Sequence, residues 1–81
     1  MITIYYKPEC PYCKKALQYC KTNKIKHAKY NVYDYNGKDN VVNALYTNGF
    51  LKRKTNVTVP IVFSKGQFIG GSEELVRLRK F

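Results

Sequence analysis

The sequence is poor in acidic residues, cysteine and histidine, and it has no tryptophan. Its 81 residues include five Asp or Glu, three Cys, one His and no Trp. An odd number of cysteines does not fit the paired disulfide framework of small secreted domains. No apolar run approaches the roughly 18 residues that a membrane helix needs, and the first residues lack the basic start and apolar centre of a signal peptide. We therefore expect a soluble, cytoplasmic protein.

What the sequence has in excess is positive charge. Fifteen Lys and Arg residues leave a formal net charge of +10, while the hydrophobic fraction of 44% is ordinary for a folded chain. The length supports one domain, residues 1–81, with a compact core, because a chain this short buries only about 60% of its unfolded surface. The charge alone suggests nucleic acid or another anionic partner.

Hydrophobic periodicity predicts the element order βαβαββα. The first strand covers residues 2–6, and a helix follows whose apolar stripe runs from Cys13 to Cys20 and which ends near Asn23. Residues 25–33 predict a second strand, and a helix over residues 41–46 is expected to be capped by Asp39 or Asn40 and closed by Gly49. After a polar, basic loop over residues 50–57, residues 59–63 and 67–69 predict a hairpin with a tight turn. Ser72 is expected to cap the last helix, with Glu73 and Glu74 in its first turn and basic residues near its end.

Two of the cysteines form the motif Cys10-Pro11-Tyr12-Cys13, which in a cytosolic chain with a βαβ pattern indicates a thiol redox pair. If the first helix begins near Cys10, its unpaired N–H groups and dipole favour a thiolate there. Cys10 would then attack a disulfide, and Cys13 would resolve the mixed disulfide.

The same cysteines admit other interpretations. A structural zinc site would use Cys10, Cys13, Cys20 and His27, but Cys13 and Cys20 lie about 10 Å apart along the expected helix, too far for one tetrahedral ion. Cys20 on the apolar stripe is predicted to be a small buried hydrophobe, with a regulatory thiol as the alternative. His27 is predicted to be an ordinary polar strand residue.

Three segments of the chain resemble the dithiol glutaredoxins. The segment from Lys7 to Cys13 resembles their active-site motif, Thr58-Val59-Pro60 their cis-proline segment, and Phe68 to Ser72 the glycine pair before their final helix. The resemblance implies a minimal thioredoxin-like fold, an α/β structure with a four-stranded mixed sheet and three helices. The wealth of Lys, Asn, Tyr and Ile suggests an AT-rich genome, in which case a minimal viral member, acting in the host cytoplasm, is one candidate.

The resemblance also implies residue roles. Cys10 and Cys13 would be catalytic, no metal or permanently bound cofactor would be present, and glutathione would be the co-substrate. Lys7 would attract the glycine carboxylate, Tyr12 would flank the sulfur, and the Val59 backbone would pair with glutathione. The implied glutathione-binding residues are Lys7, Tyr12, Thr58, Val59, Pro60, Gly71, Ser72, Glu73 and Glu74.

Some residues depart from the family pattern. Glu9 stands where Thr or Ser is common, and Ser72-Glu73-Glu74 replaces the family's Cys-Ser-Asp or Cys-Asp-Asp. The stretch from residue 50 to 57 looks longer than usual, and its Lys52-Arg53-Lys54 run is more often a solvated loop than a site.

The leading functional hypothesis is a monomeric, glutathione-dependent disulfide oxidoreductase acting on disulfide-containing proteins, with ribonucleotide reductase the family's familiar acceptor. The nearest alternative is a similar redoxin recharged by thioredoxin reductase, which the glycine pair disfavours. Less favoured are a thioredoxin proper, an iron–sulfur carrier, and a basic nucleic-acid-binding module. The excess charge is expected to steer an acidic protein partner.

Overall fold

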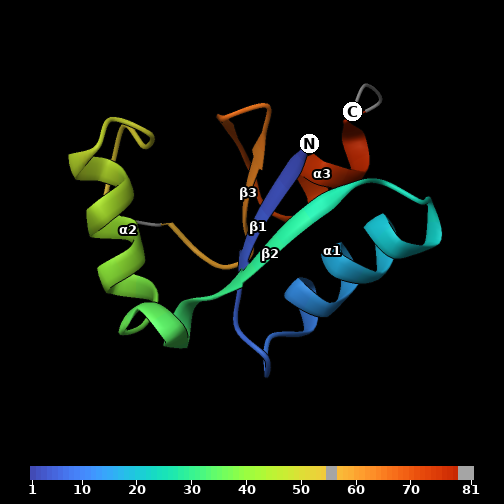
Figure 1. Cartoon of the computed structure of the whole chain (residues 1–81), viewed down its shortest axis with the longest axis horizontal. Helices are drawn as coiled ribbons and strands as arrows, with labels where there is room; N and C mark the ends of the chain where they lie inside the picture. The colour runs from blue at the N-terminus through green and yellow to red at the C-terminus, as the bar shows by residue number, and fades with distance from the viewer. Residues whose placement is uncertain (55–56, 79–81) are drawn as a thin grey trace.

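A computed structural model of the chain describes residues 1–54 and 57–78 (Figure 1). The elements follow the predicted order, with one additional short 3-10 helix. They are β1 (Ile2–Tyr6), α1 (Pro11–Thr22), β2 (His27–Asn31), η1 (Val32–Tyr35), α2 (Lys38–Thr47), β3 (Ile61–Ser64), β4 (Gln67–Gly70) and α3 (Ser72–Arg77). In the described part of the chain, no helix is both long and apolar enough to cross a membrane.

The four strands form one mixed sheet in the order β2-β1-β3-β4. β1 pairs with β2 in parallel and with β3 antiparallel, and β3 pairs with β4 antiparallel. α1 and α3 lie together on one side of the sheet, and α2 lies on the other (Figure 1). This is the predicted mixed sheet with three helices, a small thioredoxin-like fold.

Each side of the sheet has its own hydrophobic cluster, because successive side chains of a strand point to opposite faces. Towards α1 and α3, fully buried side chains from β1, α1, β3 and α3 pack together: Ile2, Ile4, Ala16, Cys20, Val62 and Leu75. Towards α2 the cluster consists of Val32, Val41, Val42, Leu51, Val57, Ile61 and Phe63. β1, which precedes the Cys10 segment, and β3, which follows the Val59–Pro60 segment, thus both have side chains in the core.

Two turns follow from residues that accept positive φ angles. Gly49 (φ 82°) closes α2, where the N–H groups of Gly49 and Phe50 bond to the carbonyls of Tyr46 and Leu45, as in a Schellman motif. The hairpin turn between β3 and β4 holds Lys65 (φ 52°) and Gly66 (φ 83°), the pattern of a type I′ turn. Both turns were predicted.

Some element ends differ from the prediction. The second strand stops at Asn31, because the Asn31 side chain accepts a hydrogen bond from the Tyr33 N–H and opens η1 instead. Gly37, rather than Asp39 or Asn40, precedes α2, and Asn40 donates to the Tyr35 carbonyl.

The last helix also starts differently from the prediction, because Gly71 holds the cap position and Ser72 is the first helical residue. The third strand begins at Ile61, so Pro60 precedes it. The predicted basic end of α3 lies partly outside the described residues, at Arg79 and Lys80.

Candidate active site

Cys10 lies at the N-terminal cap of α1, immediately after the turn that leaves β1. The Cys10 N–H bonds to the Lys7 carbonyl at 3.2 Å, and Pro11 occupies the first helical position, where a missing N–H costs nothing. The Cys13 N–H donates to the Cys10 Sγ at 3.4 Å. This half-buried sulfur therefore receives a backbone donor at a helix end, where positive partial charge favours an anion.

Cys13 lies one helical turn further on and has no solvent exposure. Burial raises the pKa of the Cys13 thiol to about 12, and the neighbouring Cys10 acts in the same direction. Cys10 and Cys13 are both free thiols. The pair is thus asymmetric, with one accessible sulfur and one protected thiol that stays protonated at neutral pH.

The segment before β3 lies beside Cys10. The Val59–Pro60 peptide bond is cis, as the resemblance implied, and the Cys10 thiol donates to the Val59 carbonyl at 3.8 Å. Pro60 is buried, Val59 is half-buried and Thr58 is exposed. The structure therefore brings together two motifs that lie 49 residues apart in the chain.

The glycine pair closes the other side of this region. A Cβ at Gly71 would stand 3.6 Å from the Pro60 carbonyl oxygen, so the pair runs directly beside the cis-proline segment. The Glu74 carboxylate accepts a hydrogen bond from the Gly71 N–H at 2.8 Å. Glu74 is thus already engaged at the start of α3.

A shallow groove of about 290 Å³ lies between the starts of α1 and α3. Tyr12, which is 59% exposed, lines it together with Ser72 and Glu73. Arg77 borders the same groove and forms an exposed ion pair with Glu73 at 3.9 Å. Three of the predicted glutathione-binding residues therefore share one groove, and one of them, Tyr12, lies two residues after Cys10 in the chain.

Sequence reasoning missed Tyr33, which lies beside the active-site turn. Its hydroxyl donates a hydrogen bond to the Glu9 carboxylate, and the Lys7 Nζ lies 6.0 Å from the centre of its ring. The hydrogen bond from Tyr33 lowers the pKa of Glu9 below its ordinary value, and Glu9 in turn raises the pKa of Tyr33. No local pattern signals this contact, because its partners are 24 residues apart.

The remaining candidate residues lie elsewhere. Cys20 is buried in the cluster between α1 and the sheet, as predicted, and burial raises the pKa of its thiol. The His27 Nδ1 lies 2.8 Å from the Ile25 carbonyl. Across residues 1–54 and 57–78, no three His, Cys, Asp or Glu side chains are grouped so that they could hold a metal ion. In the basic run, Lys54 lies over the Tyr46 ring at 5.2 Å, while Lys52 and Arg53 line a separate groove.

Comparison of the sequence with known proteins identifies the same family in each match. A sequence model of the family described as Glutaredoxin matches residues 2–69. The probable glutaredoxin of Acanthamoeba polyphaga mimivirus is 32% identical over 77 residues, which cover 91% of this chain and 73% of that protein. Glutaredoxin-2 of Schizosaccharomyces pombe is 36% identical over 80 residues, which cover 96% of this chain and 66% of that protein.

Solved structures agree with the sequence comparison. Glutaredoxin 1 from Francisella tularensis, complexed with cacodylate, has a TM-score of 0.79 at 29% identity, over 94% of this chain and 87% of that one. The buckwheat glutaredoxin–glutathione complex has a TM-score of 0.73 at 21% identity, over 94% of this chain and 64% of that one, a likeness of fold.

Proposed function

The chain belongs to the glutaredoxin family, and from that premise we propose that it is a thiol–disulfide oxidoreductase with glutathione as its electron donor. One observation supports this most directly. The accessible Cys10 sulfur lies at the start of α1, within 3.8 Å of the Val59 carbonyl and next to a fully buried second thiol. This arrangement presents one nucleophile to solvent and holds its resolving partner one turn away.

The reaction proceeds in two exchanges. The Cys10 thiolate attacks one sulfur of a substrate disulfide, and a mixed disulfide forms while the other substrate sulfur leaves as a thiolate that takes a proton from water. Cys13 then gives up its proton and attacks the Cys10 sulfur. The second substrate thiolate leaves with a proton, and a Cys10–Cys13 disulfide remains, so two electrons have passed to the substrate.

Two molecules of glutathione restore the dithiol. The first opens the Cys10–Cys13 disulfide as a glutathione mixed disulfide on Cys10, and the second releases glutathione disulfide and regenerates the Cys10 thiolate. For this, the Val59 backbone is proposed to pair with glutathione as a short added strand, since its carbonyl borders Cys10. Lys7 would attract the glycine carboxylate, and Tyr12, Thr58 and Pro60 would shape the groove.

The γ-glutamyl end is proposed to lie near Gly71, Ser72, Glu73 and Glu74. Ser72 and Glu73 line the groove beside Tyr12, whereas the Glu74 carboxylate bonds to the Gly71 N–H. Glu74 would therefore act by holding the first turn of α3 in place. The buckwheat protein, which shares this fold, was solved in complex with glutathione, which supports the choice of donor.

Single cysteine variants test the assignment. Cys10→Ser should abolish reduction of a small glutathione mixed disulfide, because no other exposed thiol replaces it in the described part of the chain. Cys13→Ser should retain much of that activity but lose reduction of protein disulfides, which needs the second thiol. The measurement is NADPH oxidation coupled through glutathione reductase, with Cys20→Ser as the matched control that keeps full activity.

The same assay separates the two possible donors. Wild-type protein should turn over with glutathione and glutathione reductase, and should not turn over with thioredoxin reductase alone. Full activity in Cys10→Ser would refute the catalytic assignment. Activity with thioredoxin reductase only would leave Cys10 as nucleophile but replace glutathione as donor.

A further inference from the structure

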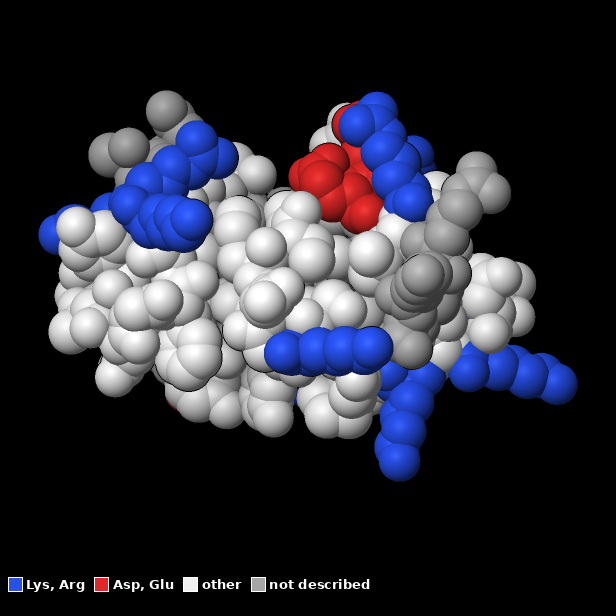
Figure 2. Space-filling model, turned by 90° about the horizontal axis from the view of Figure 1, so that it is seen from above, with Lys and Arg blue, Asp and Glu red and all other residues white. Residues whose placement is uncertain are grey.

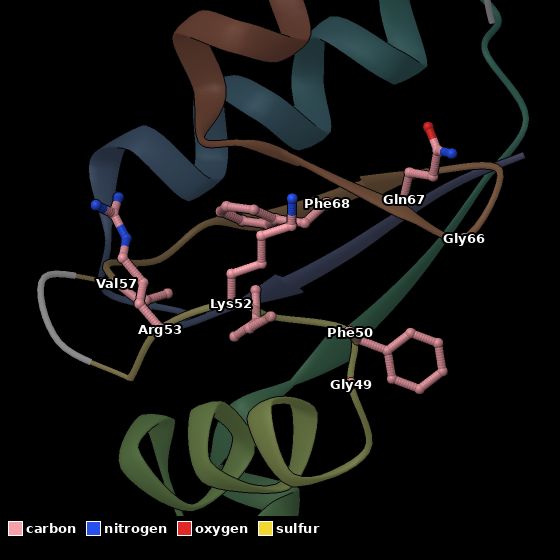
Figure 3. Close-up of a pocket in the computed structure, with 9 residues that line it drawn as sticks. Gly49, Phe50, Lys52, Arg53, Val57, Gly66, Gln67 and Phe68 are labelled. Atoms are coloured by element: carbon pink, nitrogen blue, oxygen red, sulfur yellow. The ribbon is translucent and has the colours of Figure 1, made fainter.

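A second groove, of about 630 Å³, lies between the segment that follows α2 and the hairpin of β3 and β4 (Figure 3). Arg53 lies towards one end of it in Figure 3 and Phe50 towards the other, with Lys52 and Phe68 between them. The nine lining residues include none of the residues assigned to glutathione. The groove is therefore not explained by the proposed reaction centre.

The groove exposes aromatic surface. Phe50 is 52% exposed and Phe68 is 37% exposed. Each packs against the buried Phe63, with ring centres 6.3 Å and 5.8 Å apart. Rings held in place by a buried neighbour offer apolar contact without a large cost in side-chain freedom.

The charge of the groove has one sign. Lys52 and Arg53 line it and are exposed, and no Asp or Glu is among its lining residues. The two ion pairs among the described residues join Lys38 to Asp39 and Glu73 to Arg77, so neither involves Lys52 or Arg53. In Figure 2 a group of basic side chains lies over the end of the molecule formed by α2 and the segment after it, away from the acidic side chains over α3.

One wall of the groove belongs to an edge strand. β4 pairs with β3 on one side and is the last strand of the sheet, and Gln67 and Phe68 of β4 line the groove. An edge strand offers free backbone N–H and C=O groups to an extended peptide, whereas a nucleic acid has no matching main chain. The rings of Phe63 and Phe68 are also inclined at 61° and those of Phe50 and Phe63 at 90°, which does not give a row of parallel stacking faces.

One lining residue of the groove is close in the chain to the segment that contacts Cys10. Val57 lines it, and Val59, two residues later, places its carbonyl 3.8 Å from the Cys10 Sγ. Two residues span at most about 7 Å of extended chain. A peptide that extends from the Val57 end of the groove would therefore need only a few residues to reach Cys10.

We propose that this groove binds an acidic, extended segment with an apolar side chain, carried by the protein whose disulfide Cys10 attacks. Lys52 and Arg53 would pair with its carboxylates, and its apolar side chain would pack against the exposed aromatic surface of Phe50 or Phe68. The proposal rests on the proposed function, since it names the class of protein substrate for that reaction.

Two peptides that carry the same glutathione mixed disulfide on one cysteine test the groove. One has flanking Asp and Glu residues and a Phe, and the other has Asn, Gln and Ser in their place. At saturating glutathione, kcat/KM for the acidic peptide should exceed that for the neutral one by about tenfold. In Lys52→Gln/Arg53→Gln this ratio should fall to about two or less, with activity on the neutral peptide unchanged.

Matched variants separate the groove from general attraction. Lys21→Gln/Lys26→Gln removes the same charge from exposed positions outside the groove and should keep the preference. Phe50→Ser should lower the preference without removing charge. If the two charge variants lose the preference equally, or wild type reduces both peptides at the same rate, the groove is not a docking site.

Two further outcomes have distinct meanings. If the wild type reduces neither peptide, the proposed function fails. Loss of the preference in the groove variants, with both peptides still reduced by the wild type, concerns the groove alone. A short single-stranded DNA that competes at Lys52 and Arg53 more tightly than the acidic peptide would overturn the proposal in favour of a nucleic-acid surface.

Discussion

At the scale of single residues, the two active-site cysteines owe their different roles to where α1 begins. Cys10 is the cap, so its sulfur faces a backbone N–H and the Val59 carbonyl. Cys13 is one turn inside the helix and fully buried. A shift of the helix start by one residue would move both sulfurs, so the Pro11 that occupies the first helical position is part of the site.

The raised pKa of Cys13 makes stability depend on pH in the alkaline range. The unfolded thiol ionises near its ordinary value of 9.0, whereas the folded thiol holds its proton to about 12. The unfolded state therefore binds fewer protons between these values, and the free energy of unfolding falls as pH rises above 9, by at most about 1.4 kcal/mol per pH unit for one thiol. Urea unfolding at several pH values between 7 and 11, compared with Cys13→Ala, measures this.

The variant should show a flatter decline, since the Cys13 thiol is absent from both states. Cys20, whose pKa burial also raises, contributes a decline of the same sign in both proteins. An identical pH dependence in wild type and Cys13→Ala would contradict the raised pKa.

At the scale of elements, the junction between β4 and α3 holds the glycine pair in place. Gly70 has a φ of 127°, and a Cβ there would meet the Glu74 side chain at 2.4 Å. Glu74 lies at that spot because its carboxylate accepts the Gly71 N–H. Gly70, Gly71 and Glu74 therefore form one unit that starts the short α3 beside the cis-proline segment.

Replacing Gly70 by alanine should destabilise the protein more than the same change at Gly49. Both glycines have positive φ, but a Cβ at Gly49 meets nothing within 4 Å. We expect a loss of about 1 kcal/mol for Gly49→Ala from backbone strain, and of about 2–3 kcal/mol for Gly70→Ala, which also breaks the Glu74 hydrogen bond. Urea unfolding gives both values.

A double variant identifies the cause. In a Glu74→Ala background, Gly70→Ala should cost about 1–2 kcal/mol less than it does in the wild type, because the clash and the hydrogen bond are both gone and only backbone strain remains. If the extra loss persists without Glu74, the contact with its side chain is not responsible.

At the scale of the whole molecule, acidic and basic side chains are distributed differently. The acidic side chains seen in Figure 2 gather over α3, whereas basic side chains lie at several places on this face, including a group over the end that carries α2. A net charge of +10 creates a field that reaches beyond contacts and speeds the approach of anionic partners. The net charge would then speed association with acidic disulfide proteins, and the groove would slow the dissociation of those that carry a matching segment.

Salt should therefore affect acidic substrates selectively. Raising NaCl from about 20 to about 200 mM shortens the screening length severalfold and should lower kcat/KM for an acidic disulfide protein by about tenfold. At saturating glutathione, a neutral disulfide peptide should lose less than about twofold. The measurement is initial rate against substrate concentration at each salt, and equal losses for both substrates would show that salt acts on the enzyme itself.

Much of this arrangement could be predicted from local pattern. Cys13, Ala16 and Cys20 of the predicted stripe are buried, the glycine at position 49 closes α2, and the predicted tight turn falls at Lys65 and Gly66. These features depend on neighbours within a few residues, and so their signals lie in the sequence. The helix starts at Gly37 and Gly71 were missed because nearby Asp, Asn or Ser residues are stronger caps in isolation.

The sequence by itself determined the order of elements, the pair of cysteines on the first helix and the resemblance that its three segments carry. Only the tertiary structure decided that Tyr33 holds Glu9, that Glu74 is committed to Gly71, and that Lys52 and Arg53 share a groove with Phe50 and Phe68. There are two physical reasons: the partners are far apart along the chain, and several groups compete for the same side chain. Contacts between remote segments depend on how strands pair and helices pack, and a side chain with several possible partners is assigned to one of them only when the fold brings them together.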